Sequence, residues 1–319
     1  MKKDNALTKF MRKYGNVIVI IVLIIGFALI NPAFLTVYNF TNIIRQIAMM
    51  GIVSVGFTFV MVGGGLDLSV GSQIAFMNIC VAAMIDSQKI GPVLAVIIGL
   101  LATTILGGIN GYVISKTNVP PLIATLAMQN VLRGCAYLIS HGYPIYSIPK
   151  GIKVFGQGYL LKWIPVPGII LIVIIILGSI VLNRTYLGRH FYAMGNNAEA
   201  ARLAGINVRM TRTISYTLLG FLTGIAALIM LGRVGSGQPN VAQGFEMDVL
   251  TACVIGGVSV NGGKGRVSGA ILGAVIIGIV NNGMSLAGAN EYWQMVIRGL
   301  VLLSVVVFDS INTAKRKAN

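Results

Sequence analysis

Charged residues are scarce in this sequence, and acidic residues are the scarcest. Only 10% of its 319 residues are charged, and Asp and Glu together number eight. A soluble domain carries about 25% charged residues, so an ordinary water-soluble fold is excluded. So few acids also leave few groups that could couple protons or cations to transport inside a membrane.

Patterns of catalytic and metal-binding residues are missing as well. Cys80, Cys135 and Cys253 lie in apolar segments, without the spacing of a metal site or a disulfide framework. No nucleophile–base set is visible. The nearest string to a phosphate-binding loop, residues 262–266, lacks the hydroxyl that would hold magnesium. We therefore expect no catalytic residue, no metal site and no ATP site in this chain.

Hydrophobic residues, in contrast, make up 56% of the chain, and 40 residues are glycine. A membrane span needs about 20 apolar residues, and small residues let such helices pack closely. The sequence therefore predicts an all-α, polytopic transmembrane bundle with a single domain over residues 1–319. The ten candidate spans are 16–30, 43–62, 68–85, 91–114, 122–138, 165–182, 214–231, 247–260, 267–284 and 292–309.

The positive charge follows the pattern that orients membrane proteins. The net charge is +16, but Lys and Arg lie at the ends of the candidate spans and not on one soluble face, which disfavours nucleic acid as a partner. If the N-terminus is inside, the inside segments carry 16 Lys and Arg residues and the outside segments carry five. This bias predicts that both termini are cytoplasmic.

A short polar segment, residues 194–206, stands out within the internal connection at about 183–213. Asn196 or Asn197 can cap a helix there by accepting a backbone N–H bond, and Gly205 can end it in a left-handed turn. A helix of about eight residues is marginal in water by itself. We therefore expect this coupling helix to dock on a soluble partner in the cytoplasm.

The first glycine-rich break, residues 63–72, contains three consecutive glycines that should interrupt a helix. Such a break is tolerated at membrane depth only where protein covers it or where it lines a cavity. Asp67 is the one carboxylate between the apolar spans here, and Ser69 is expected to cap the following helix. Two roles for Asp67 remain open, a clasp within the bundle and a place on the solute path.

A second break, residues 256–270, has the same order of apolar run, glycines and small-residue helix start. The two breaks are either remnants of an internal repeat, as in many transporters, or convergent turns.

Further along the chain, Glu246 and Asp248 are expected to cap an external helix start, with a proton relay as the alternative. Asn281 and Asn282 could hydrogen-bond between helices, and Tyr292 and Trp293 fit an interfacial belt.

These residues together resemble a known family. Residues 65–72, Gly-Leu-Asp-Leu-Ser-Val-Gly-Ser, resemble the Gly-x-Asp-Leu-Ser-Val-Gly signature of ribose/galactose/xylose-type ABC sugar-transporter permeases. The resemblance covers about residues 30–310. Further matches, in the family's order, lie at residues 187–189, 195–206, 256–259, 262–265, 281–283 and 292–294.

The resemblance implies roles for two sets of residues. Residues 199–205 are similar to the Glu-Ala-Ala…Gly coupling loop that seats in a groove of the cytoplasmic ATPase. The implied coupling residues are Asn197, Glu199, Ala200, Ala201, Arg202 and Gly205. The implied helix-break or translocation residues are Gly65, Asp67, Ser69, Gly71, Gly262 and Gly263.

The resemblance also implies the partners and the setting. We expect a dimer of about ten-helix bundles with one path between two permease copies, in the bacterial cytoplasmic (inner) membrane. ATP and Mg would bind to two cytoplasmic ABC ATPase subunits, and an extracytoplasmic sugar-binding protein would deliver the solute. The expected function is ATP-driven import of a monosaccharide or a related small polar solute. The alternative is an ion-coupled secondary transporter or channel, for which Asp67 would be the one acid at mid-depth.

Overall fold

The computed structural model describes residues 6–160 and 163–317, and these form an α-helical bundle with one small β-ladder. The helices are α1 (Ala6–Ile30), the 3-10 helix η1 (Pro32–Leu35), α2 (Val37–Val62), α3 (Val70–Asp86), α4 (Pro92–Thr117), α5 (Pro121–Ser140), α6 (Lys150–Gln157), α7 (Val166–Arg184), α8 (Tyr186–Asn196), α9 (Ala198–Leu203), α10 (Val208–Val234), α11 (Phe245–Ile255), α12 (Val267–Leu286) and α13 (Glu291–Lys317). Strands β1 (Tyr159–Leu160) and β2 (Ile164–Pro165) pair antiparallel.

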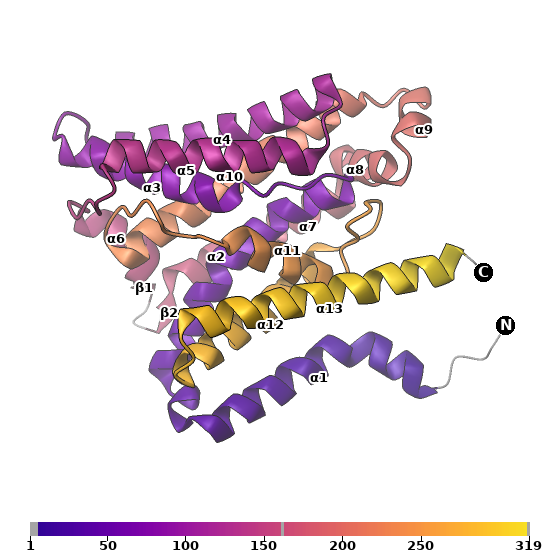
Figure 1. Cartoon of the computed structure of the whole chain (residues 1–319), viewed down its shortest axis with the longest axis horizontal. Coiled ribbons are helices and arrows are strands. Elements are labelled where there is room, and N and C mark those ends of the chain that lie inside the picture. Colours follow the sequence, from indigo (N-terminus) through magenta and orange to yellow (C-terminus); the bar gives the residue numbers. More distant parts are fainter. Residues whose placement is uncertain (1–5, 161–162, 318–319) are drawn as a thin grey trace.

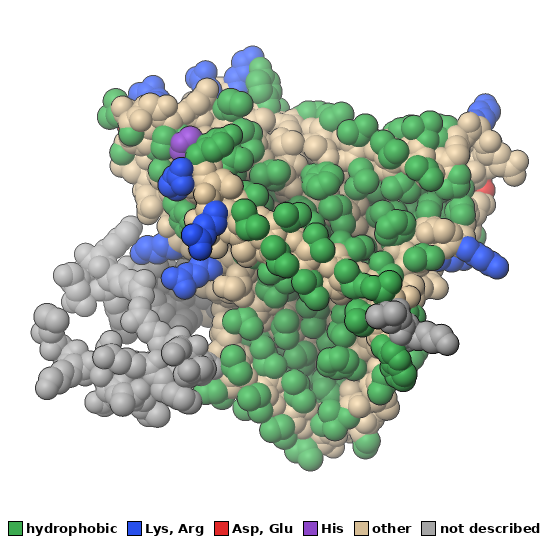
Figure 2. Space-filling view, turned by 180° about the vertical axis from the view of Figure 1, so that it is seen from behind, with side chains coloured by type: hydrophobic (Ala, Val, Ile, Leu, Met, Phe, Trp, Pro, Cys, Tyr) green, Lys and Arg blue, Asp and Glu red, His purple; other side chains and the backbone are tan. Residues whose placement is uncertain are grey.

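The long helices lie side by side, and most of their connections gather at two opposite ends (Figure 1). One end carries α8 and α9 and is called the α9 end. The other carries α6, β1 and β2 and is called the α6 end. Apolar side chains cover much of the surface between the two ends, while Lys and Arg lie toward the ends (Figure 2). This distribution matches a body whose middle faces hydrocarbon and whose ends face water.

Helix α2 is the centre of the bundle, because nearly every residue from Ile47 to Val62 is buried. It packs against α7, α10 and α12. Small residues allow a close crossing between α4 and α10. A Cβ added at Gly107 would overlap the carbonyl oxygen of Tyr216 and lie 3.0 Å from the Cα of Gly220. The glycine content thus shortens the distance between helices, as packing in lipid favours.

Each of the ten candidate spans overlaps a helix, and the all-α, multi-pass architecture is confirmed. Among the described residues, six helices are long and apolar enough to cross a membrane by their length and composition: α2, α4, α5, α7, α10 and α12. Shorter apolar helices cover Gly15–Ile30 and Val70–Asp86.

The predicted span 247–260 is wrong at its C-terminal end. Helix α11 has 11 residues and ends at Ile255, where glycines 256 and 257 follow. At 1.5 Å per residue it is about 16 Å long, roughly half of a bilayer core.

The two long connections contain more structure than the sequence indicated. The external connection at 139–164 includes α6 and β1, and Gly156 of α6 packs directly on the backbone of Gly232 in α10. The internal connection at 183–213 includes α8 before the expected coupling helix, and α10 already begins at Val208. Both additions are short amphipathic helices, whose signal is weak beside that of the long apolar runs.

We predict that Gly107→Ala destabilises the α4–α10 crossing by about 1–3 kcal/mol, because the added methyl group overlaps backbone atoms that cannot turn away. Gly26→Ala is the matched control, since Gly26 lies in the interior of α1 with no atom near its added Cβ. The measurement is thermal unfolding of both purified variants in the same detergent. Equal melting temperatures for the two variants would contradict the packing argument.

Candidate coupling and translocation site

Helix α9 is a short capped helix at the edge of the molecule. The Asn197 side chain accepts a bond from the Ala200 N–H at 3.0 Å, and Gly205 has φ +85°. The Gly205 N–H reaches Arg202 O and the Ile206 N–H reaches Ala201 O, both at 3.0 Å. The predicted caps are therefore confirmed, with Asn197 and not Asn196 at the start of the helix.

Most of α9 faces outward. Ala201 is its one buried residue, while Leu203 is 81% exposed. Glu199 and Arg202 form an ion pair of 2.5 Å whose side chains are both about two-thirds exposed. Such an exposed pair stabilises the helix little. An exposed apolar side chain beside exposed charges is the composition of a surface that another protein can cover.

Three glycine segments that lie far apart in the sequence meet beside α8. We call this contact the glycine junction, formed by residues 63–65, Gly195 and residues 262–263. The Gly263 N–H donates to Val62 O, the end of α2, at 2.8 Å. A Cβ on Gly195 would overlap that same carbonyl, and one on Gly262 would lie 2.9 Å from the Cα of Gly64. Backbone here touches backbone, so side chains are excluded.

Helix α8 joins α9 to the glycine junction. The Tyr192 hydroxyl donates to Gly265 O at 2.7 Å, and the Met194 side chain packs on Gly63. Burial raises the pKa of Tyr192 above its usual value, so the phenol stays protonated and can donate. Only Asn197 separates α9 from α8. The start of α9 is therefore less than one helical turn away from Gly195, which contacts the end of α2 and the 256–266 loop.

Asp67 lies inside the bundle with none of its surface exposed. Its Oδ1 accepts from the Ser69 N–H at 2.8 Å and from the Ser69 hydroxyl at 2.5 Å, and its Oδ2 accepts from Asn110 of α4 at 3.2 Å. Asn110 is seven residues before the end of α4, or about 10 Å into the bundle. No Lys or Arg pairs with Asp67 among the described residues.

The surrounding loop is held by other helices as well. Tyr216 of α10 donates to Leu66 O at 3.0 Å, and the Leu68 N–H donates to the Thr125 hydroxyl of α5 at 3.2 Å. The break after α2 is thus covered by protein, which is one of the two conditions under which an interrupted helix persists in lipid.

Ser69 does not cap α3, contrary to expectation. Its backbone is helical and its side chain makes no cap bond. Its hydroxyl instead donates to Asp67 and accepts from Gln73 at 2.9 Å and Asn110 at 3.0 Å. The Ser69 hydroxyl oxygen is thus taken by two side-chain donors and is not available to the backbone N–H groups of α3. Gly71 follows in the first turn of α3, where a Cβ would overlap the Glu246 carboxylate.

Glu246 and Asp248 lie in the first turn of α11, as predicted, but both are buried within the bundle and not exposed at its surface. Glu246 is 4% exposed, and its Oε1 accepts from Gln129 of α5 at 2.9 Å. Gln129 is eight residues into α5, or about 12 Å from the α9 end of that helix. The non-helical segment 235–244 therefore enters the bundle from the α6 end, and α11 begins partway through it. Asp67 is therefore one of three acids buried within the described part of the bundle, beside Glu246 and Asp248.

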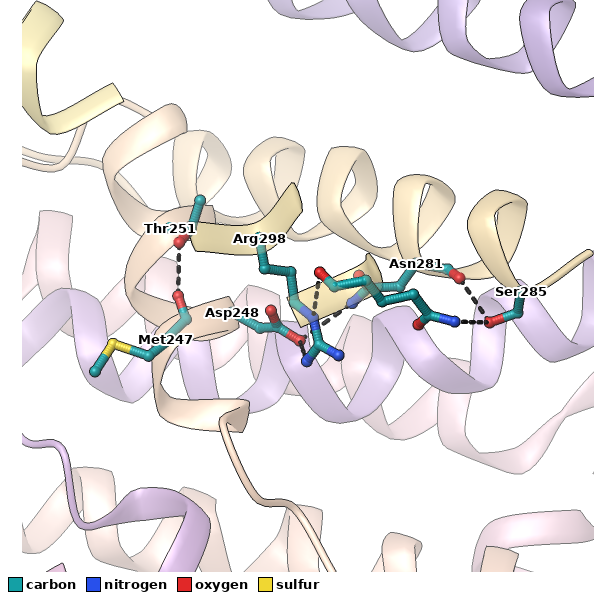
Figure 3. A network of polar contacts seen from close by, with 7 residues as sticks. Met247, Asp248, Thr251, Asn281, Ser285 and Arg298 are labelled. Carbon is teal, nitrogen blue, oxygen red and sulfur yellow. Dashed lines mark hydrogen bonds and ion pairs between the residues drawn. The ribbon is translucent and has the colours of Figure 1, made fainter. Parts of the chain in front are cut away.

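Asp248 connects three helices (Figure 3). Its Oδ2 accepts from Asn281 of α12 at 3.1 Å and lies 3.5 Å from an Arg298 guanidinium nitrogen of α13. Both partners point toward it in the figure. A buried acid with a cation and an amide donor is satisfied, so this group holds α11, α12 and α13 together.

The predicted amide contacts between helices are present. Asn282 of α12 and Asn39 of α2 exchange two hydrogen bonds of 2.8 and 2.9 Å. Tyr292 and Trp293 are 77% and 63% exposed, in keeping with an interfacial belt. Sequence reasoning missed Asn110, Gln129 and Arg298 as partners of the acids. Their signal was available, because each is a polar side chain inside an apolar span.

Comparisons with known proteins match the chain along most of its length. A family model described as "Branched-chain amino acid transport system / permease component" matches residues 39–306. Ribose import permease protein RbsC of Bacillus subtilis strain 168 is 39% identical over 306 residues, covering 95% of this chain and 94% of that protein. L-arabinose transport system permease protein AraH of Escherichia coli K12 is 39% identical over 302 residues, covering 93% and 90%. No solved structure matches the chain significantly.

We predict that Asp67→Asn lowers the folded yield and the melting temperature. The new amide group faces the Asn110 N–H that Asp67 accepts and leaves that N–H unpaired, although Asn110 keeps its bond to Ser69; the cost is about 1–3 kcal/mol. Asp86→Asn is the control, since Asp86 is exposed at the α6 end and bonds to Ser147 there. Size-exclusion yield and thermal unfolding measure the effect. Normal stability with lost transport would instead place Asp67 on the solute path.

Proposed function

We propose a function for this chain on the premise that it belongs to the family described as "Branched-chain amino acid transport system / permease component", and within it to the permeases of sugar ABC transporters. It is the membrane-spanning subunit of an ATP-driven importer, and it moves a monosaccharide or a related small polar solute. The observation that carries this proposal is the 39% identity to a ribose import permease over 95% of the chain.

The power source is a separate cytoplasmic ABC ATPase, which binds ATP and Mg. An extracytoplasmic sugar-binding protein delivers the solute, and a second permease copy completes the transporter. Glu199, Ala200 and Arg202 contact the ATPase, while Asn197 and Gly205 shape α9 and Ala201 seats it on this chain. The exposure of α9 and its exposed Leu203 support this assignment.

In this mechanism, ATP binding closes the ATPase pair and displaces α9. Helix α8 passes the displacement to the glycine junction, where Gly262 and Gly263 meet residues 63–65. Helices α2, α3 and α12 all begin or end within a few residues of this contact. The bundle then changes between inward- and outward-facing arrangements as packed bodies. Gly65, Asp67, Ser69 and Gly71 keep the break after α2 closed to water during the change.

The proposed setting is the bacterial cytoplasmic membrane, with about ten spans, the α9 end in the cytoplasm and both termini on that side. Basic residues at the α9 end support this orientation, because cytoplasmic segments are enriched in Lys and Arg. They are Lys116, Arg184, Arg189, Arg202, Arg209, Arg212, Lys264 and Arg266.

An ion-coupled transporter is the second candidate, and one observation favours it. Glu246 is buried inside the bundle, and its Oε2 has no hydrogen-bond partner among the described residues. Acids inside a membrane often mark a proton or ion path. The identity to named import permeases of sugar transport systems weighs more, because it extends over the whole fold and not over one residue.

For coupling, we predict that Gly205→Val lowers binding of the cognate ATPase at least tenfold. A β-branched residue at φ +85° is strained, and relief of the strain breaks the bonds that end α9. Gly142→Val is the matched control, since Gly142 has φ +81° at the α6 end and equally open surroundings. Glu199→Gln tests the surface itself, because it leaves the helix intact. Binding in nanodiscs and sugar uptake are both measured, and wild-type values for Gly205→Val and Glu199→Gln would refute the coupling role.

For the source of energy, we predict that proteoliposomes holding this chain, the ATPase and the binding protein take up D-ribose or L-arabinose with ATP and without any ion gradient. A protonophore should change the rate less than about twofold, since the acids are structural. Uptake that needs a gradient and ignores ATP would support the ion-coupled transporter. Glu246→Gln in the same assay shows whether that carboxylate titrates during transport.

A further inference from the structure

The end of α4 and the start of α10 lie side by side at the α9 end of the molecule (Figure 1). Between them is an open groove of about 440 Å³, a size typical of pockets that bind small molecules. It is lined by Tyr112, Ser115 and Lys116 of α4 and by Arg209, Met210 and Thr213 of α10. The Tyr112 and Met210 side chains are 54% and 60% exposed, so a ligand can enter from the surroundings of the protein.

The groove continues an apolar face of α4 that is exposed along the bundle. Leu101, Ile105, Ile109 and Tyr112 are exposed, and their spacing along the sequence places them on one side of the helix. Lys116 follows one turn later on the same side. Helix α4 has 26 residues and is about 39 Å long, while the hydrocarbon core of a bilayer is about 30 Å thick. Lys116, the penultimate residue of α4, therefore lies at the depth of the lipid headgroups.

The two cations of the groove have donors to spare. The Lys116 ammonium donates to the Tyr112 hydroxyl at 3.0 Å and lies 5.3 Å from the centre of that ring, which leaves two of its three donors available. Arg209 accepts a bond from Thr213 at its backbone carbonyl. Neither cation takes part in an ion pair among the described residues. The groove therefore presents an ammonium and a guanidinium group without an acidic partner from the described part of the chain.

The start of α10 adds to this positive charge. The N-terminal end of a helix carries a partial positive charge, and the first turn of α10 contains Arg209 and no acidic residue. In contrast, α9, α11 and α13 each have an acidic residue in the first turn. Like charges that are brought together repel each other unless an anion lies between them. A phosphate group in the groove would accept bonds from both Lys116 and Arg209, which are side chains that favour phosphate.

We propose that this groove binds the headgroup of an anionic phospholipid from the membrane leaflet at the α9 end. The phosphate lies between Lys116 and Arg209, and the acyl chains lie along the exposed apolar face of α4. Basic pockets between helices on the cytoplasmic side of a membrane are known to bind such headgroups. Residues 204–207 alone separate α9 from α10, so the lipid holds the start of α10 against α4 close to the coupling helix. The binding itself does not depend on the function proposed above.

An acidic surface of a soluble protein is the rival occupant, and lipid fits the groove better. The groove opens beside a face that suits hydrocarbon, and the Tyr112 ring and the Met210 side chain give it an apolar wall. A tyrosine at headgroup depth is typical of the membrane interface. A lysine there extends its apolar stem along such a wall and places its ammonium group among the headgroups. The same arrangement offers little to a water-soluble surface.

The test compares two double variants of the full chain. Lys116→Gln with Arg209→Gln removes both cations of the groove. Arg184→Gln with Arg189→Gln is the matched control, since it removes the same charge at the α9 end from two exposed residues that do not line the groove. Each protein is purified in nanodiscs of phosphatidylcholine that contain increasing fractions of phosphatidylglycerol. Native mass spectrometry counts the bound phosphatidylglycerol, and thermal unfolding is followed in parallel.

We expect the groove variant to bind phosphatidylglycerol at least about tenfold more weakly than the wild type, because two basic contacts to the headgroup are lost. It should also lose the rise in melting temperature that this lipid gives to the wild type. The control should stay within about twofold of the wild type in affinity. Lys116→Arg with Arg209→Lys keeps both charges and should retain binding, which separates loss of the site from misfolding.

Three results would overturn the proposal. Equal loss of binding in the groove variant and the control would mean that the basic end of the protein attracts anionic lipid without a site. Stabilisation by inorganic phosphate in pure phosphatidylcholine, equal to that by phosphatidylglycerol, would mean a site for a soluble anion. Weaker binding of the ATPase by the groove variant in pure phosphatidylcholine would assign the groove to that protein. The lipid readouts need neither ATP nor sugar, so a failure of ATP-driven import is recognised separately.

Discussion

The structure depends on one constraint: backbone polar groups inside a membrane must find partners within the protein. The helix breaks of this chain are places where that constraint is hardest to meet. At the glycine junction it is met by backbone alone, since the Gly263 N–H takes the last carbonyl of α2. At the 63–69 loop it is met by side chains of α5 and α10 and by Asp67, whose carboxyl group Asn110 of α4 holds in place. Polar residues within the spans thus supply hydrogen-bond partners to the segments where the helices are interrupted.

The fold was largely predictable because span helices carry their signal in long apolar runs. All ten ranges fall on helices, and the two glycine-rich breaks lie where three or more glycines interrupt those runs. The caps of α9 could also be predicted from the sequence, since an Asn or Gly cap interacts with backbone groups only a few residues away along the chain. Helices α6 and α8 were missed because short amphipathic helices are fixed by what they pack on. The early end of α11 was missed because residues 258–260, Val-Ser-Val, continue its apolar pattern.

The candidate site was predictable in its parts and not in its assembly. The sequence identified the segments around Asp67, Gly195 and Gly263, but nothing in their spacing says that they touch. Those contacts arise from helix packing over long sequence separations. The depth of Glu246 illustrates the limit most clearly. An acid after a polar loop has the signature of a helix cap at the surface, and only the path of segment 235–244 into the bundle places it at mid-depth.

Arg133 has a consequence beyond the bonds that it makes. It is on α5, and both carbonyls that it holds belong to the segment that leads into α11. A rigid guanidinium that grips two carbonyls fixes their distance and direction together. A tilt of α5 would therefore displace the start of α11. The other end of α11 leads into the 256–266 loop, which contains Gly262 and Gly263 of the glycine junction. Together with the bond from Gln129 to Glu246, Arg133 makes α5 and the start of the half-helix one mechanical unit.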